Sequence, residues 1–275
     1  MSDENKIRDT ADAIKGIVEA IPVYQDILQP AAKEIGTALQ TVAKTVHIAL
    51  APVSALVWGY DQIKEFVSTR ITEKLKDVPP ENIISPKLNV AGPALELLKY
   101  TGHDKFLREM YANLVAASMN VITTNEAHPA FVDIIKQLTP DEARILKLFT
   151  TQSTFPLLDV NKLVTVHGHS GTGHIRMLHN FSLIGIKANC ERPNDAPIYI
   201  DNLCRLGLAE VLSGIKLFSS ELYEELESSD EINQIKLTHR ETSPDSIQIV
   251  RGGIKLTEFG SRFCKICIGQ DLISS

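Results

Sequence analysis

The sequence has no excess of basic residues, and this limits how it could bind nucleic acid. Its 275 residues contain 28 Lys and Arg against 34 Asp and Glu, a net charge of −6. Residues 1–137 hold 14 basic and 17 acidic residues, and residues 138–275 hold the same numbers, so each half carries 14 − 17 = −3. Because sequence-independent DNA affinity comes from neutralising phosphates, DNA binding here would require a local basic face.

Cysteine is also scarce. The four cysteines, Cys190, Cys204, Cys264 and Cys267, all lie in the second half. A secreted disulfide scaffold carries a denser set, and the polar start of the chain, residues 1–6, has no apolar signal core behind it. We therefore expect reduced thiols in a cytoplasmic protein. Cys264 and Cys267 have the spacing of half a zinc or redox site, but no matching second pair follows, so we expect buried structural thiols.

Long hydrophobic runs are missing as well. The most apolar stretch of the first half, residues 45–60, contains no Asp, Glu, Lys or Arg, but it includes Pro52 and is shorter than the roughly 20 residues of a membrane-spanning helix. Its simplest interpretation is a buried, alanine-rich pair of helices. The alternative is a segment that inserts into the inner membrane on activation. The candidate inserting residues are Ile48, Leu50, Val53, Leu56, Val57, Trp58 and Tyr60.

Apolar residues spaced three or four apart predict helices through most of the first half. The expected helices span residues 9–18, 31–46, 62–76, 94–100, 105–121 and 129–138. Pro93 is expected to open the fourth of these helices, and Asp104 to cap the fifth. Arg108 and Glu109 are expected in solvent or in salt bridges. Residues 1–138 therefore form a predicted helical bundle.

The pattern changes at Thr139, where Thr-Pro-Asp-Glu is a strong helix start. The segments that follow predict a helix at 197–206, a strand from Leu208, an acidic helix at 221–227, strands at 246–250 and 253–256, and a final helix capped by Thr257. Ile198, Tyr199, Leu203 and Leu206 are expected to line one face of the first of these helices. This order predicts a winged-helix-like α+β domain over residues 139–275, with a mainly α fold for the whole chain.

Two short sequence motifs and three longer segments resemble those of known proteins. Leu206-Gly-Leu208 and Leu256-Thr-Glu-Phe-Gly260 resemble bacterial regulators of the winged-helix class. The runs Phe106–Met119, His128–Phe131 and Ile135–Ala143 resemble the bacterial abortive-infection alpha family, most strongly over residues 80–150. That resemblance implies a role in phage defence, and it transfers no catalytic residue.

Four histidines lie within thirteen residues: His167, His169, His174 and His179. They could supply zinc ligands, but no Asp, Glu or Cys falls among them and three glycines do. We therefore expect a glycine-rich polar loop and no cofactor or metal. The same segment lacks the lysine of a phosphate-binding loop and the second glycine of a nucleophile elbow.

Basic residues in the second half are too few for a DNA-reading helix. The candidate contacts to DNA or a partner are Arg205, Arg240, Arg251 and Lys255. The acidic segment at 221–227 would repel DNA if it shared their face. A protein partner or self-association is therefore favoured over DNA, and no small-molecule substrate is evident.

Together with the role in phage defence that the family resemblance implies, these patterns favour a non-enzymatic defence protein. In this hypothesis the C-terminal half senses or binds a partner, and the helical half oligomerises or perturbs the inner membrane. The alternative is a DNA-binding transcriptional regulator with a helical dimerisation half. A third hypothesis, an enzyme using a metal in the histidine loop, has the least support.

Overall fold

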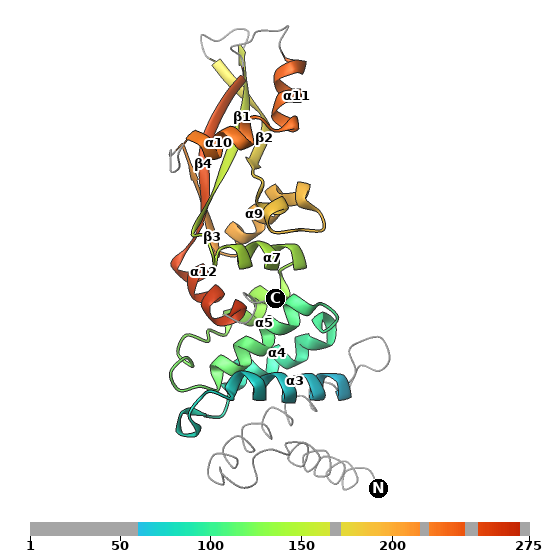
Figure 1. Cartoon of the computed structure of the whole chain (residues 1–275), viewed down its shortest axis with the longest axis vertical. Coiled ribbons are helices and arrows are strands. Elements are labelled where there is room, and N and C mark those ends of the chain that lie inside the picture. Colours follow the sequence, from blue (N-terminus) through green and yellow to red (C-terminus); the bar gives the residue numbers. More distant parts are fainter. Residues whose placement is uncertain (1–59, 166–171, 215–219, 240–246, 270–275) are drawn as a thin grey trace. The chain divides into compact units, whose positions relative to one another are not determined.

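The structure, a computed structural model, describes residues 60–165, 172–214, 220–239 and 247–269 (Figure 1). The chain is an α+β protein whose contacts divide it into two units. Within the described residues, unit 1 comprises 60–140 and 265–269, and unit 2 comprises the parts of 141–264 that lie between the gaps.

The described part of unit 1 is helical and is built around its most buried helix, α5 (Lys105–Ser118). Helices α3 (Tyr60–Leu75), α4 (Leu88–Thr101) and α6 (Ala130–Lys136) pack against α5, and the 3-10 turn η1 (Pro80–Asn82) precedes α4. Asp104 caps α5, as predicted, by accepting a 2.8 Å hydrogen bond from the Leu107 N–H. The prediction for α4 was wrong at its start, because the helix begins at Leu88 and contains Pro93. The proline is exposed there, so water can satisfy the carbonyl that it leaves without a partner.

A buried carboxylate joins α5 to α3. Glu109 accepts a 2.8 Å hydrogen bond from Arg70 Nε and lies 3.4 Å from Lys74 Nζ. Its side chain is almost fully buried, so these two cations replace the water that it loses. Of the two environments predicted for Glu109, the salt bridge is the one that the structure contains.

Unit 2 is built on a four-stranded antiparallel sheet with the strand order β2-β1-β4-β3. The strands are β1 (Thr154–Thr165), β2 (Thr172–Phe181), β3 (Ala209–Ser213) and β4 (Ile247–Leu256). The long hairpin of β1 and β2 was not predicted. Residues 155–158 of β1 are buried in succession, so the strand lacks the alternation of polar and apolar residues by which a strand is recognised in a sequence.

Strand β4 corrects the predicted pair of short strands at 246–250 and 253–256. It runs without a break from Ile247 to Leu256 and pairs with β1 on one side and β3 on the other. A Cβ atom on Gly252 would lie 2.7 Å from the carbonyl oxygen of Leu212. Gly252 is therefore required by close strand packing and not, as its sequence context suggested, by a turn.

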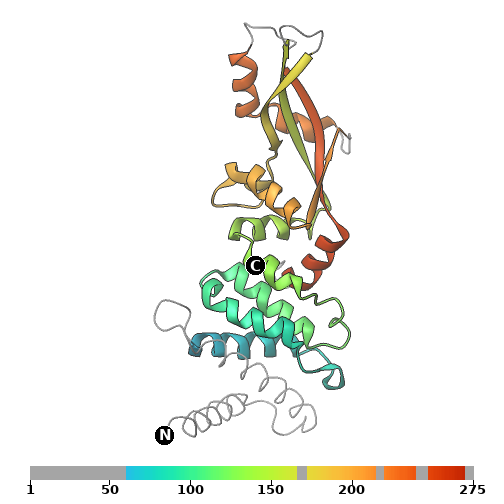
Figure 2. The same ribbon diagram turned by 180° about the vertical axis from the view of Figure 1, so that it is seen from behind.

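Two helices cover one face of the sheet. Helices α10 (Ser220–Glu227) and α11 (Asp230–Thr238) form a core with β1. The buried members of this core are Leu158, Val160, Tyr223, Leu226 and Ile232. Helix α10 lies in front of the strands in Figure 1 and behind them in Figure 2. The acidic segment 221–227 is thus a helix, as predicted, but it also buries an apolar face.

The remaining helices of unit 2 are α7 (Pro140–Leu148), α8 (Ile184–Lys187), α9 (Ala196–Arg205) and α12 (Glu258–Phe263), with the 3-10 turn η2 (Pro193–Asp195) before α9. Helix α9 confirms the predicted helix at 197–206. Its buried side is formed by Tyr199, Ile200 and Leu203, whereas Ile198 is 65% exposed. Ile198 therefore does not share the face of Tyr199 and Leu203, contrary to the prediction, because successive residues of a helix point about 100° apart.

Candidate functional site

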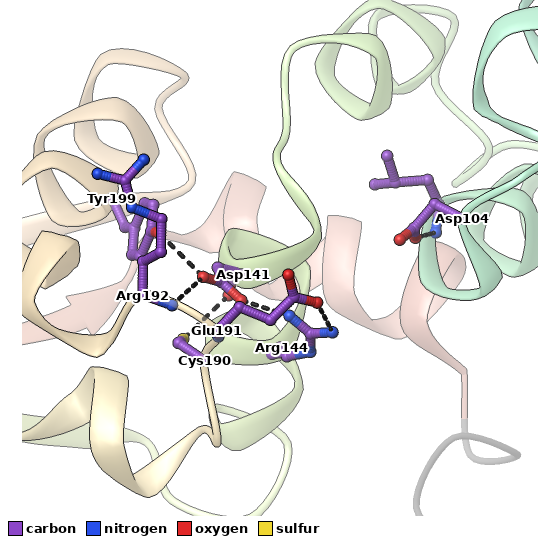
Figure 3. Close-up of polar contacts among 8 residues, drawn as sticks. Asp104, Asp141, Arg144, Cys190, Glu191, Arg192 and Tyr199 are labelled. Carbon is purple, nitrogen blue, oxygen red and sulfur yellow. Dashed lines mark hydrogen bonds and ion pairs between the residues drawn. The ribbon is translucent and has the colours of Figure 1, made fainter.

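Asp141, in the first turn of α7, is a buried carboxylate of unit 2 that accepts hydrogen bonds from several segments of the chain (Figure 3). It is only 5% exposed and accepts hydrogen bonds from the N–H groups of Glu191 (2.9 Å) and Arg192 (3.0 Å). The hydroxyl of Tyr199 in α9 donates to it at 2.9 Å, and Arg144 forms an ion pair with it. One side chain thus ties α7 to the segment before η2 and to α9.

These donors determine the charge of Asp141. Burial alone would raise its pKa, but the N–H groups of Glu191 and Arg192, the Tyr199 hydroxyl and Arg144 together lower the pKa below its ordinary value. A carboxylate whose oxygens are occupied by so many donors is a poor general base. Asp141 is therefore a structural clamp. The neighbouring Glu142 acts similarly, accepting a 2.7 Å hydrogen bond from Asn202 Nδ2.

The cysteines are free thiols, and all four lie in the described residues. Burial, assisted by Asp141, raises the pKa of Cys190 to about 12, and burial raises the pKa of Cys264 to about 12. Thiols at such pKa values stay protonated at neutral pH and are weak nucleophiles. Cys264 and Cys267 are both buried, as expected.

A second polar cluster lies where β2 departs from regular pairing. The register of β1 and β2 shifts on either side of Val160, so β2 bulges around His179 and Asn180. Asn180 has a φ of 50°, in the left-handed region that few residues other than glycine adopt. Bulges are frequent where a strand must re-aim a side chain. Here the bulge brings His179 and Asn180 close to two carboxylates.

Those carboxylates are Asp159 of β1 and Asp201 of α9. Asp159 Oδ1 lies 3.0 Å from His179 Nδ1 and accepts a 2.8 Å hydrogen bond from the N–H of Asn180. Asp201 Oδ1 accepts a 2.8 Å hydrogen bond from Asn180 Nδ2, and that nitrogen also lies 3.0 Å from His179 Nε2. The carboxylates thus lie on opposite nitrogens of the His179 ring.

The predicted histidine loop lies only partly within the described residues. His167 and His169 lie outside the described residues, whereas His174 and His179 belong to β2. Across the described part of the chain, no group of three or more His, Cys, Asp or Glu side chains is placed to hold a metal ion. The His179 cluster was not predicted, because its acidic members lie 20 residues before and 22 residues after the histidine in the sequence.

The predicted DNA or partner contacts are dispersed and internally bonded. Arg251 Nε forms a 2.7 Å ion pair with Glu227, and its guanidinium lies 5.1 Å from the centre of the Tyr223 ring. Lys255 pairs with Glu210 at 3.0 Å, and Arg205 donates to Asn202 Oδ1. Arg240 lies outside the described residues. Within the described part of unit 2, these three cations are used by neighbouring acceptors rather than gathered on a basic face.

Six of the seven candidate membrane-inserting residues also lie outside the described residues: Ile48, Leu50, Val53, Leu56, Val57 and Trp58. The seventh, Tyr60, is the first residue of α3. In the part of the chain that was searched, namely the described residues, no helix combines the length and the apolar character needed to cross a membrane.

The fold and these sites define an α+β protein with a helical unit and a sheet-based unit. The family model described as abortive infection alpha matches residues 59–267, so the chain belongs to that family. This confirms the resemblance found over residues 80–150 and suggests an abortive-infection type of phage-defence role.

The comparison with curated proteins found no match. One similar solved structure is an uncharacterized protein from the hydrocarbon-degrading marine bacterium Alcanivorax borkumensis SK2. It is 18% identical, with a TM-score of 0.35, over 53% of this chain and 94% of that chain.

Proposed function

We propose that this chain is a non-enzymatic abortive-infection protein that stops the growth of phage-infected cells through contacts with another protein. The observation that carries the proposal is the family match over residues 59–267. The absence of catalysis is supported by the state of the described side chains. Asp141 is occupied by four donors, and the raised pKa values of Cys190 and Cys264 keep both thiols protonated.

In this proposal unit 2 is a winged-helix-like interaction module. The order of its elements supports this, since α7, β1, α8, α9, β3 and β4 follow one another as helix, strand, helix, helix, strand and strand. Strand β4 lies between β1 and β3, as the last strand of such a domain does. Strand β2 and helices α10 and α11 are then insertions that extend the sheet and cover one face of it.

In this proposal helix α9 is the counterpart of the recognition helix, and its surface favours a protein partner over DNA. Base edges are read mainly by Arg, Lys, Asn and Gln. The exposed residues of α9 are instead Ile198, Asp201 and Arg205, and Arg205 is bonded to Asn202. A large exposed apolar side chain beside a carboxylate suits the centre of a protein interface better than the phosphate backbone.

The helical half is proposed to act as the effector. It would oligomerise or expose residues 45–60 to the inner membrane once unit 2 has met its partner. This assignment rests on the uncharged character of that segment. Recruitment from the cytoplasm to the membrane is part of the same proposal.

Replacing Ile198 with aspartate is expected to abolish phage protection without unfolding the protein. The side chain is 65% exposed, so the substitution costs little folding free energy but places a charge at the proposed interface. Protection is measured as the efficiency of plaque formation on bacteria that express the full chain. The melting temperature should stay within about 2 °C of the unchanged protein.

The matched control is Ile186→Asp on α8, an isoleucine that is 58% exposed and lies outside α9. It should keep full protection. Equal loss in both variants would count against α9 as the interface.

In the same cells, membrane depolarisation during infection would support the membrane effector, and growth arrest at an intact potential would eliminate it. Salt-dependent retention on DNA that falls in Arg251→Ala would revive the regulator hypothesis.

A further inference from the structure

We infer that the end of the β1–β2 hairpin docks unit 2 on an anionic phospholipid surface. This hairpin tip comprises residues 162–165 of β1 and 172–176 of β2. Its apolar anchors are Leu163 and Ile175, and its cations are Lys162 and Arg176. The tip is separate from the proposed partner interface on α9 and from residues 45–60, so it can bind lipid whether or not those assignments hold.

The hairpin tip has cations but no acidic residue. No Asp or Glu occurs from Val160 to Cys190, although the whole chain has a net charge of −6. Arg176 is exposed, and its guanidinium forms no hydrogen bond or ion pair within the described residues. Its charge is therefore available to an anionic partner, and each Lys or Arg close to an anionic membrane adds to the attraction.

The charge of Lys162 is not neutralised by a carboxylate of the neighbouring helix α11. Lys162 Nζ lies 3.2 Å from His239 Nδ1, at the end of that helix. Asp230 and Glu231 are in its first turn, at the opposite end. In Figures 1 and 2, α11 lies beside this end of the hairpin, whereas α10 crosses the strands farther from it. Residues 240–246, which include Glu241 and Asp245, lie outside the described residues.

The hairpin continues past β4 as a two-stranded ribbon within the described residues. Strand β4 pairs with β1 as far as the Lys162–Ile247 pair, whereas β1 and β2 continue to pair as far as Thr165 and Thr172. The three additional residues of each strand span roughly 10 Å. This length is close to the depth of about 5–10 Å to which peripheral elements are buried in a membrane interface.

Apolar side chains are exposed on both faces of this ribbon. Leu163 is paired with His174, and Ile175 is paired with Lys162. Paired residues share a face, and neighbours along a strand alternate, so Leu163 and Ile175 lie on opposite faces. They are 38% and 54% exposed. A flat protein partner would cover one face and leave the other in water, whereas a membrane interface surrounds an element that enters it.

The cations are distributed in the same way. Lys162 shares the face of Ile175, and Arg176, which is paired with Asn161, shares the face of Leu163. Each face therefore combines an aliphatic side chain with a long cationic one, which can keep its charge among the lipid headgroups.

Nucleic acid fits the hairpin tip less well. A protein held on DNA by about 6–10 phosphate contacts needs many cations, whereas the tip supplies Lys162 and Arg176. The phosphate backbone also offers no apolar surface to Leu163 and Ile175, whereas the boundary between headgroups and acyl chains does.

The test is cosedimentation of the full chain with vesicles of phosphatidylcholine and phosphatidylglycerol, and with vesicles of phosphatidylcholine alone. We expect binding to the anionic vesicles that weakens in raised salt, and little binding to the neutral ones. Arg176→Gln should lower the partition coefficient about 5-fold, as for one cation near an anionic surface. Ile175→Thr keeps a β-branched side chain suited to a strand and should lower it at least about 10-fold.

The matched controls are Ile186→Thr and Arg192→Gln, which alter exposed residues of the same types outside the hairpin. Both should bind the vesicles as the unchanged protein does. All four altered side chains are exposed, so the melting temperatures should remain close to that of the unchanged protein.

Absent or equal binding to the two kinds of vesicle overturns the inference. Binding that persists in Ile175→Thr and Arg176→Gln also overturns it, and would place the lipid contact elsewhere, as residues 45–60 of the proposed effector would. Retention on duplex DNA that falls in Arg176→Gln, without binding to anionic vesicles, would assign the hairpin tip to nucleic acid instead.

Discussion

Asp141→Ala is expected to lower the free energy of unfolding of unit 2 by about 3–5 kcal/mol. The substitution leaves the N–H groups of Glu191 and Arg192, the Tyr199 hydroxyl and the Arg144 guanidinium without their common acceptor. Whole domains are stable by only about 5–15 kcal/mol. The change should therefore move the urea unfolding midpoint far down, as followed by far-ultraviolet circular dichroism.

Glu191→Gln is the control for this prediction. Glu191 pairs with the same arginine at 2.8 Å, but its side chain is 77% exposed, so the loss should stay below about 1 kcal/mol. A similar cost for both substitutions would mean that Asp141 contributes only its charge and not the clamp of α7, the segment before η2 and α9.

The contribution of Asp141 should also depend on pH. Its pKa is lowered in the folded protein, so its stabilising effect is complete above the unfolded pKa of about 3.9 and is lost as pH falls through the lower folded value. Asp141→Asn should thus be less stable than the unchanged protein at pH 7. The difference should shrink in urea titrations below about pH 4. A difference that stays constant down to pH 3 would contradict the assigned charge.

The helices of this chain were largely predictable because their signals are local. Asp104 and Thr257 cap the helices that they were predicted to cap, and each accepts a hydrogen bond from an N–H three residues on. The acidic helix 221–227 also follows from its composition. In each case the residues that determine the element lie within one turn of one another.

The sheet and the polar clusters depend on partners that are distant in sequence. Gly252 signals a turn locally, yet it lies within a strand because the carbonyl of Leu212 packs against it. His179 meets Asp159 and Asp201 only after β1, β2 and α9 have assembled. Asp141 was predicted only as part of a helix start, although three of its four donors lie 50 to 58 residues downstream. Reading these sites from the sequence would require the strand register first.

The segments Leu206–Leu208 and Leu256–Gly260 are in direct contact in the folded protein, and we expect a large loss of stability when this contact is disturbed. The Thr257 hydroxyl donates to the Gly207 carbonyl at 2.6 Å, and the Thr257 N–H donates to the Leu208 carbonyl at 3.0 Å. Gly260 lies so close that an added Cβ would be 1.8 Å from the Leu208 oxygen. The start of α12 is therefore packed directly on the backbone that leads into β3.

Gly260→Ala is expected to destabilise unit 2 by about 3 kcal/mol or more, because the methyl group meets backbone that cannot move aside without displacing β3 or α12. Gly207→Ala is the matched comparison. A Cβ there meets nothing within 4 Å, so only the left-handed φ of 72° is penalised, at about 1–2 kcal/mol. Urea unfolding should rank the variants in that order. The reverse order would mean that α12 can shift freely against β3. Phage protection, measured by plaque formation at growth temperature, should then be lost in Gly260→Ala and retained in Gly207→Ala. A loss of about 3 kcal/mol or more is a large fraction of the roughly 5–15 kcal/mol by which domains are stable, whereas a loss of about 1–2 kcal/mol is a smaller one.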